Sequence, residues 1–280
     1  MTLIRALSLL VVATAAQAQI VEPGLILDLD AEKGVHLEDG DRVAKWTNQV
    51  ARFKARDFVK RDEGRAEPGS GRPTLKEAVE ASGGRATLVF RRQELINHDE
   101  DAFDHLITGD GYTWFAVVCL YKQVVQLKDV NSFFGNLKNG GNFEGIWGNV
   151  TDDNRLWIGS RNGITFGRWD ENNPMVLAPQ RLETNRFYVL AGRIGAGTSE
   201  VTIEAFINDA KPAASKPFPV NPRANSSKFA IGQERDATNH PGQESFDGEI
   251  ARFLVYERPL TDRELHQTMQ QLKTTYKIEQ

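Results

Sequence analysis

Short runs of apolar and β-branched residues, separated by turn residues, constrain the fold of this chain more than any other feature. The longest run, Trp114–Tyr121, is apolar almost throughout and therefore predicts a buried central strand. The same pattern predicts strands over residues 25–30, 86–90, 155–159, 164–169, 187–192, 201–207, 228–232 and 249–256. Many short strands with frequent Gly and Asn turns predict an all-β fold, a jelly-roll β-sandwich.

Turn residues predict how neighbouring strands are joined. Asn162-Gly163 predicts a hairpin between 155–159 and 164–169, because Asn-Gly favours the tight turns that connect antiparallel strands. Gly195-Ala196-Gly197 predicts a second hairpin between 187–192 and 201–207. The proline-rich segment 211–227 has no periodicity and is predicted to be a long loop.

One helix is clearly marked near the C-terminus. Thr261-Asp-Arg-Glu264 has the spacing of a capping box, in which the Thr and Glu side chains bond to each other's backbone N–H groups. The apolar residues that follow recur with helical spacing and predict an amphipathic helix packed on the sandwich: Leu265, Met269, Leu272 and Tyr276. A weaker pattern predicts a second helix over 74–81.

The first 18 residues have the layout of a secretory signal peptide. Arg5 precedes an apolar run over 6–16, and Ala16-Gln17-Ala18 is a cleavage site. The run is too short to cross a bilayer, and no later segment has the length of a membrane span. We therefore predict a signal peptide at 1–18, a single jelly-roll domain at 19–280, and a protein secreted to the periplasm or the exterior.

Charge and cysteine content exclude two classes of protein. The chain has 34 Lys+Arg against 38 Asp+Glu, a net charge of −4, so it lacks the basic surface of a nucleic-acid-binding protein. Its single cysteine, Cys119, excludes a disulfide-stapled scaffold. Because Cys119 lies in the longest apolar run, we expect it to act as a small buried apolar side chain.

Five segments, taken in order, resemble the secreted laminin-G-like jelly rolls of the concanavalin A-like lectin/glucanase superfamily. The resemblance extends over most of residues 24–278, and its most specific part is the C-terminal strand and helix. The segments are 25–34 with 43–49, 72–90, 112–118, 201–208, and 231–232 with 246–264. The resemblance implies the fold. It leaves the function open, because that superfamily contains binding modules, glycosidases and lyases.

A carbohydrate site is predicted from aromatic residues interleaved with polar ones. Sugars stack their apolar faces on exposed aromatic rings, and polar neighbours bind their hydroxyl groups. A stretch rich in Gly and Asn and a polar loop beyond it supply both kinds of side chain. The candidate ligand-binding residues are Trp147, Trp157, Trp169, Arg155, Arg168, Asn239 and His240.

The resemblance also implies a structural calcium ion. Many members of the superfamily hold calcium between the N-terminal strand and the closing strand, and the matching acidic positions here are Asp30 and Asp247. Calcium prefers several oxygen ligands of this kind. Calcium is therefore the expected cofactor, supporting the geometry of the loops.

The favoured hypothesis is a non-catalytic module that binds a polysaccharide, a glycan or an extracellular protein. The first alternative is a polysaccharide hydrolase or lyase on the same fold. It would use the carboxylates of Asp28-x-Asp30-x-Glu32, or Arg92-x-Glu94-Leu95 with His98 and His105. The Glu-x-Asp-x-Glu arrangement of related glucanases is absent from the internal strands, which disfavours this alternative. The second alternative is a structural adhesion module of a surface assembly.

Overall fold

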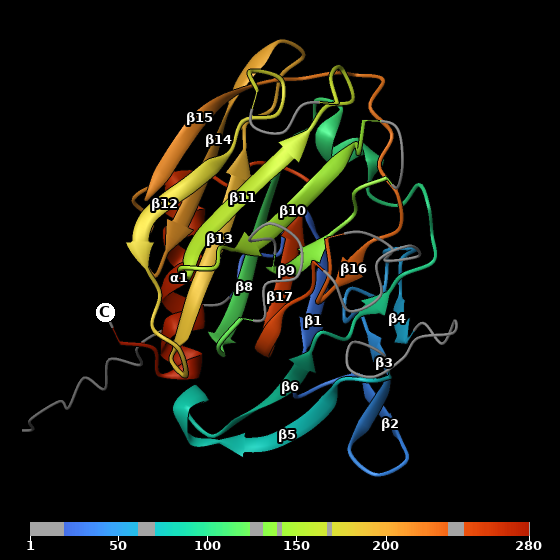
Figure 1. Cartoon of the computed structure of the whole chain (residues 1–280), viewed down its shortest axis with the longest axis vertical. Helices are drawn as coiled ribbons and strands as arrows, with labels where there is room; N and C mark the ends of the chain where they lie inside the picture. Colours follow the sequence, from blue (N-terminus) through green and yellow to red (C-terminus); the bar gives the residue numbers. More distant parts are fainter. Residues whose placement is uncertain are drawn as a thin grey trace, which may run out of the picture.

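The computed structural model describes residues 20–60, 71–123, 131–138, 142–166, 170–234 and 244–279. Its strands form two antiparallel layers (Figure 1). The first layer runs in the order β5 (Thr74–Val79), β6 (Arg85–Arg91), β17 (Asp247–Tyr256), β8 (Tyr112–Leu120), β13 (Phe187–Ile194), β14 (Glu200–Ile207) and β15 (Ala214–Pro219). Beside β6, β1 (Leu25–Asp30) pairs with the C-terminal half of β17.

The second layer contains the remaining strands. Their order is β12 (Val176–Arg181), β11 (Arg155–Arg161), β10 (Gly145–Val150), β9 (Asn131–Gly135), β16 (Ala230–Ile231), β7 (Leu95–Ile96), β4 (Asp57–Lys60), β3 (Arg42–Thr47) and β2 (Val35–Glu38). Two short 3-10 helices lie in connections, η1 (Glu80–Ser82) and η2 (Asp104–Ile107). The predicted jelly-roll sandwich is confirmed.

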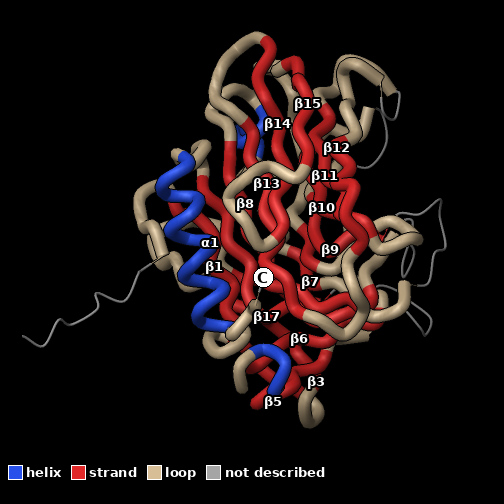
Figure 2. Tube along the Cα trace, turned by 90° about the vertical axis from the view of Figure 1, so that its left-hand side faces the viewer, coloured by secondary structure: helices blue, strands red, loops and turns tan. Residues whose placement is uncertain are grey.

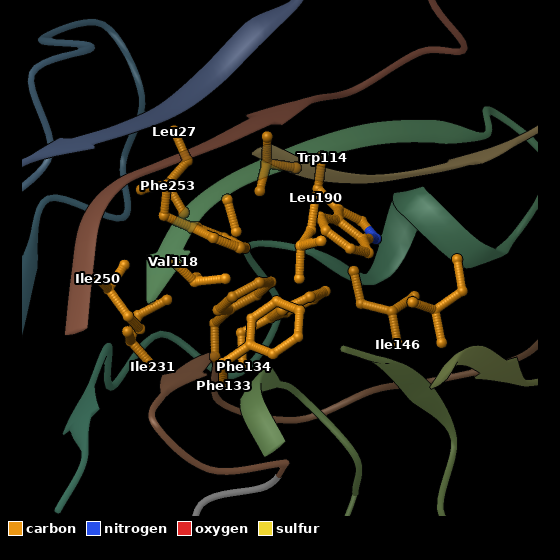
Figure 3. Packing of buried hydrophobic residues seen from close by; sticks show 14 of the residues in the cluster. Leu27, Trp114, Val118, Phe133, Phe134, Ile146, Leu190, Ile231, Ile250 and Phe253 are labelled. Carbon is orange, nitrogen blue, oxygen red and sulfur yellow. The ribbon is translucent and has the colours of Figure 1, made fainter. Parts of the chain in front are cut away.

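The main hydrophobic core lies between the two layers. Side chains alternate along a strand, so every second residue of β8 points inward, among them Trp114 and Val118. They meet Phe134 of β9 and Ile146 of β10 from the opposite layer (Figure 3). The predicted central strand is confirmed, since β8 pairs with β13 on one side and β17 on the other.

The outer face of the first layer is covered by helix α1 (Asp262–Tyr276), which runs along one side of the molecule (Figure 2). Its apolar side, with Leu265 and Met269, forms a second buried cluster with Phe115 and Cys119 of β8. Burial raises the pKa of the Cys119 thiol to about 12, so it stays protonated. Cys119 is thus a buried apolar residue of a strand, as predicted.

The predicted capping box of α1 is present, and it makes helix stability dependent on pH. Thr261 Oγ1 accepts a hydrogen bond from Glu264 N, while Glu264 Oε2 accepts one from Thr261 N at 2.9 Å. Hydrogen bonds from Arg258, at 2.7 and 2.9 Å, are the main reason that the Glu264 pKa falls from 4.5 to about 2. The folded state therefore favours the ionised carboxylate.

We expect Glu264→Gln to lower the free energy of unfolding at pH 7 by about 1 kcal/mol, because glutamine can keep the capping bond but loses the bidentate ion pair with Arg258. A depressed carboxyl pKa stabilises the fold above pH 4.5 and loses that effect as the pH falls towards 2. The difference between variant and wild type should therefore shrink steadily below pH 4.5 in urea titrations. Glu279→Gln, beyond the end of α1, is the control, and an equal effect of both substitutions would contradict the assignment.

Three local predictions are wrong. Residues 74–81 form β5 and η1, because pairing with β6 outweighs the helical propensity of Lys-Glu-Ala. Segment 211–227 contains β15, whose prolines are tolerated at the edge of the layer. Residues 164–166 form no strand, since β11 makes its hairpin with β10 instead.

The predicted signal peptide at 1–18 lies outside the described residues. Across the described ranges, no helix combines the length and the apolar character that a membrane crossing requires.

Candidate functional site

Exposed apolar side chains gather at one end of the β10–β11 hairpin. In the described part of the chain, three large hydrophobic residues are exposed: Leu37, Ile164 and Phe166. Ile164 and Phe166 are 53% and 65% exposed, and both lie in the segment that follows β11. Because large apolar side chains are seldom exposed side by side on a protein surface, this pair marks a candidate binding site.

Phe143 and Arg161 complete this surface. Gly145 pairs with Arg161 across the hairpin, so Phe143 and Phe166 flank the same end of it. Their ring centroids are 5.4 Å apart at 46°, and the Arg161 guanidinium lies 5.0 Å from the Phe143 centroid and 6.0 Å from that of Phe166. We name Phe143, Ile164 and Phe166, with Arg161 beneath them, the rim platform.

Side-chain amides hold the turn that carries the platform. Asn162 Oδ1 accepts a hydrogen bond from Ile164 N at 2.9 Å, and its Nδ2 donates to Pro219 O at 2.8 Å. Asn221 Nδ2 donates to Asn162 O, also at 2.8 Å, so the turn is clamped to the end of β15. Gly163 has a φ of +76°, a left-handed conformation that glycine adopts without strain.

The far side of the segment is anchored by Asp170. Its carboxylate accepts hydrogen bonds from Thr165 Oγ1 at 2.7 Å and from Asn173 N at 2.9 Å. Burial opposes the ionised form, but these bonds outweigh it and lower the Asp170 pKa. Thr165, which precedes Phe166, is thus held in place, and an ordered backbone lowers the entropy cost of binding a ligand.

The platform rests on a small cluster of buried tryptophans. Trp147 of β10 and Trp157 of β11 are 5% and 3% exposed, and their rings meet edge to face at 6.2 Å. Leu137 is buried with them, and Phe143 packs against the cluster. The expectation that Trp147 and Trp157 present exposed faces for stacking is therefore wrong. The outward side of this layer is filled by the two rings, which support Phe143.

The other candidate ligand-binding residues do not join the platform in the described part of the chain. Arg155 lies at the opposite end of β11 from Arg161, and its Nε is 2.9 Å from Asp153 Oδ1 in the β10–β11 turn. Arg168, Trp169, Asn239 and His240 lie outside the described residues.

The two carboxylates expected to share calcium lie apart. Antiparallel pairing sets Asp30 opposite Arg252, whereas Asp247 is opposite Arg91. Arg252 and Asp247 are five positions apart in β17, which corresponds to about 16 Å of strand. Each aspartate already faces an arginine, at 3.9 Å for Asp30 and 3.6 Å for Asp247. The pair therefore does not fit one calcium ion, and the described residues hold no cluster of three His, Cys, Asp or Glu that could bind a metal.

Four residues of the enzyme alternative have structural partners: Asp28, Asp30, Glu32 and His105. Asp28 and Asp30 do share one face of β1, as their spacing predicts, but both face Arg252. Glu32 accepts a hydrogen bond from Ala86 N at 2.5 Å. His105 Nε2 lies 3.3 Å from Glu257 Oε2, and His98 is exposed.

Sequence reasoning missed Phe143, Ile164 and Phe166. The alternation of Ile164-Thr165-Phe166 predicts a strand, and aromatic residues in strands are usually buried. The sequence does contain a signal for their exposure. Asn162-Gly163 follows closely on a predicted strand, and a turn at that point can carry the next apolar residues out of the layer.

The structure resembles several solved carbohydrate-associated proteins, at a level that shows the fold alone. Domain 4 of AbnA, an extracellular arabinanase from Geobacillus stearothermophilus solved with arabinotriose, is 16% identical. That match has a TM-score of 0.53 and covers 89% of this chain and 100% of that domain. Trypanosoma rangeli sialidase in complex with sialic acid is 14% identical, with a TM-score of 0.54. The match covers 92% of this chain and only 34% of the sialidase.

A third structure of the same fold is the binding domain of botulinum neurotoxin DC in complex with SialylT. It is 11% identical, with a TM-score of 0.50, and the match covers 89% of this chain and 52% of that one. No curated protein matches the sequence. The family model of the concanavalin A-like lectin/glucanases superfamily matches residues 126–266, half of the chain, including the hairpin that carries the platform. The chain therefore belongs to the concanavalin A-like lectin/glucanases superfamily.

Proposed function

We propose that this protein is a carbohydrate-binding module that takes a glycan on the rim platform without catalysis. The observation that carries the proposal is the exposure of Ile164 and Phe166 on a turn fixed by hydrogen bonds. Such a surface matches the apolar face of a sugar ring, and the Arg161 guanidinium beneath it polarises the Phe143 ring. Structures of this fold solved with arabinotriose and with sialylated ligands support the class of ligand.

We expect Phe166→Ala to weaken glycan binding at least tenfold, because it removes the most exposed ring of the platform. A tenfold loss corresponds to about 1.4 kcal/mol, within the range of one stacking contact. The free energy of unfolding should stay within about 0.5 kcal/mol of wild type, since the side chain is mostly exposed. Calorimetric titration with a glycan selected on an array, beside urea unfolding, measures both quantities.

Leu37→Ala is the matched control for this prediction. Leu37 is also a large exposed apolar residue, at 42%, but it lies on β2, far from the β10–β11 hairpin in the order of the second layer. The Leu37→Ala variant should bind glycan as tightly as wild type. Equal losses of glycan affinity in both variants, or no loss in Phe166→Ala, would show that the rim platform does not bind the glycan.

The array itself distinguishes the proposal from its alternatives. It should include arabinotriose and sialylated glycans, and be run with and without EDTA. Binding should be the same in both conditions, because Asp30 and Asp247 do not share a cation site. Release of reducing ends or unsaturated uronates from a bound polysaccharide would favour the hydrolase or lyase. Binding to a protein surface with no glycan signal would favour an adhesion module.

We also propose that the protein acts outside the cytoplasm, on the basis of the leader-like residues 1–18. Expressed with its own N-terminus, the mature protein should begin at Gln19. N-terminal sequencing of the exported fraction measures this directly, and Ala18→Arg should block cleavage. A mature chain that retains Met1 in the cytoplasm would contradict export.

A further inference from the structure

A cavity lies on the opposite side of the molecule from the rim platform. It opens on the outer face of the first layer, between the β5–β6 hairpin and the ends of β8 and β13, and has a volume of about 500 Å³. That volume lies in the range of small-molecule sites. The polar residues of its wall are Lys76, Arg91, Tyr121, Lys122, Asn185 and Glu249, and we name it the basic pocket.

Glu249 organises the floor of the basic pocket. Its side chain is only 4% exposed, yet it lies on the outer face of β17. Oε1 accepts hydrogen bonds from Tyr121 OH at 2.5 Å and Lys76 Nζ at 3.1 Å, and Oε2 accepts one from Thr87 Oγ1 at 2.6 Å. Because both oxygens of this buried carboxylate already accept hydrogen bonds, Glu249 positions Tyr121 and Lys76 and leaves ligand binding to them.

Tyr121 is oriented so that its oxygen can accept a further hydrogen bond. Burial, and then the bond to Glu249, raise the pKa of its hydroxyl above the usual value, so it remains protonated. Its proton is donated to Glu249, which leaves the oxygen lone pairs free to accept from a ligand hydroxyl. The Arg91 guanidinium stacks on the ring at 4.4 Å and fixes its plane.

The charge of the wall favours an anion. Three cationic side chains line the pocket, Lys76, Arg91 and Lys122, against the single carboxylate of Glu249. Lys76 shares its charge with Glu249, and Arg91 forms an ion pair with Asp247 at 3.6 Å. The Arg91 side chain is 59% exposed, so several of its five N–H donors still face the opening. Lys122 is exposed at the mouth. Guanidinium and ammonium donors therefore remain available at the opening.

We propose that the basic pocket binds one acidic sugar residue, with its carboxylate at Arg91 and Lys122 and a hydroxyl group at Tyr121. Val79 and Phe187 supply the apolar part of the wall that a sugar ring contacts. This site is separate from the rim platform, because the two lie on the outward faces of different layers. It goes beyond the proposed function and does not depend on it.

The probe is D-glucuronate, compared with D-glucose and with sulfate, titrated into the whole protein at low salt. We expect one glucuronate to bind per chain, at least tenfold more tightly than D-glucose, with an affinity that falls as salt rises. Equal affinity for glucuronate and glucose would overturn the anionic assignment. Equal affinity for glucuronate and sulfate would show a general anion site and overturn the assignment to a sugar.

Variants locate the ligand. The double substitution Arg91→Gln and Lys122→Gln should weaken glucuronate binding at least tenfold. Arg85→Gln is the control: Arg85 lies at the other end of β6 and is also in an ion pair, and its substitution should leave the affinity unchanged. Tyr121→Phe should weaken glucuronate binding severalfold and leave sulfate binding unchanged. This result would distinguish recognition of a sugar hydroxyl group from recognition of negative charge. Phe166→Ala should leave glucuronate binding intact. Loss of glucuronate in Phe166→Ala, or no loss in the double variant, would place the sugar acid elsewhere and overturn the proposal.

Discussion

Replacing Arg252 by methionine should lower the free energy of unfolding by about 3–5 kcal/mol at neutral pH, the usual result of removing one partner of a buried ion pair. Arg252 Nε and Nη2 donate to the two oxygens of Asp28 at 2.9 and 2.8 Å, and Nη1 lies 3.9 Å from Asp30 Oδ2. The three side chains are 17%, 13% and 8% exposed. Without the guanidinium, two carboxylates would remain buried beside each other.

The deficit of Arg252→Met should depend on pH. Burial already raises the Asp30 pKa in the wild type, and Arg252 is the main group that opposes this. In the variant the folded pKa rises further, so the folded state binds protons more tightly than the unfolded state and recovers stability as the pH falls. Unfolding in guanidinium chloride should therefore show that the stability difference between wild type and Arg252→Met becomes smaller from pH 7 to pH 4.

A triple variant supplies the control for this result. Asp28→Leu, Asp30→Leu and Arg252→Met together remove the whole ion cluster, and apolar replacements of buried ion pairs are often neutral. The triple variant should recover most of the stability and lose the pH dependence. A loss below about 1 kcal/mol in Arg252→Met, or the same deficit at pH 7 and pH 4, would show that the cluster is solvated.

The Arg252 cluster illustrates what the sequence could predict. Alternation alone places Asp28 and Asp30 on one face of a strand, and the structure confirms it. Their partner lies more than 200 residues away in sequence, so pairing of β1 with β17 had to be known first. A single sequence contains little information about the register of strands that are distant along the chain. That register is what places Asp30 and Asp247 far apart.

The same limit explains the errors at the candidate site. Central strands such as β8 are predictable because burial on both faces produces an unbroken apolar run. The sequence pattern does not predict β2, β3, β4, β5, β7, β9, β10, β12 or β15, because these strands are short, glycine-rich, partly exposed or contain proline. Missing β10 led to the wrong hairpin partner for β11, and Phe166 was then placed in a strand.

Trp147 gives the sharpest test of how the rim platform is built. Trp147→Ala should lower the free energy of unfolding by about 3–5 kcal/mol, the range for removing a buried aromatic side chain. Phe143 packs against the tryptophan cluster, so glycan binding should fall at least tenfold at a temperature where the variant is still folded. Unfolding in urea and titration at 10 °C measure the two effects separately. Phe166→Ala, by contrast, should change binding alone.

Trp147→Phe distinguishes support from direct contact. The Trp147 indole Nε1–H is buried and has no hydrogen-bond partner among the described residues, so the substitution removes no bond within them. It keeps a ring beside Trp157 and below Phe143. If Trp147 only supports the platform, this variant should bind glycan within about twofold of wild type, at a modest cost in stability. If it loses tenfold or more, the platform depends on the full size of the indole ring, and support by any aromatic ring at this position is contradicted.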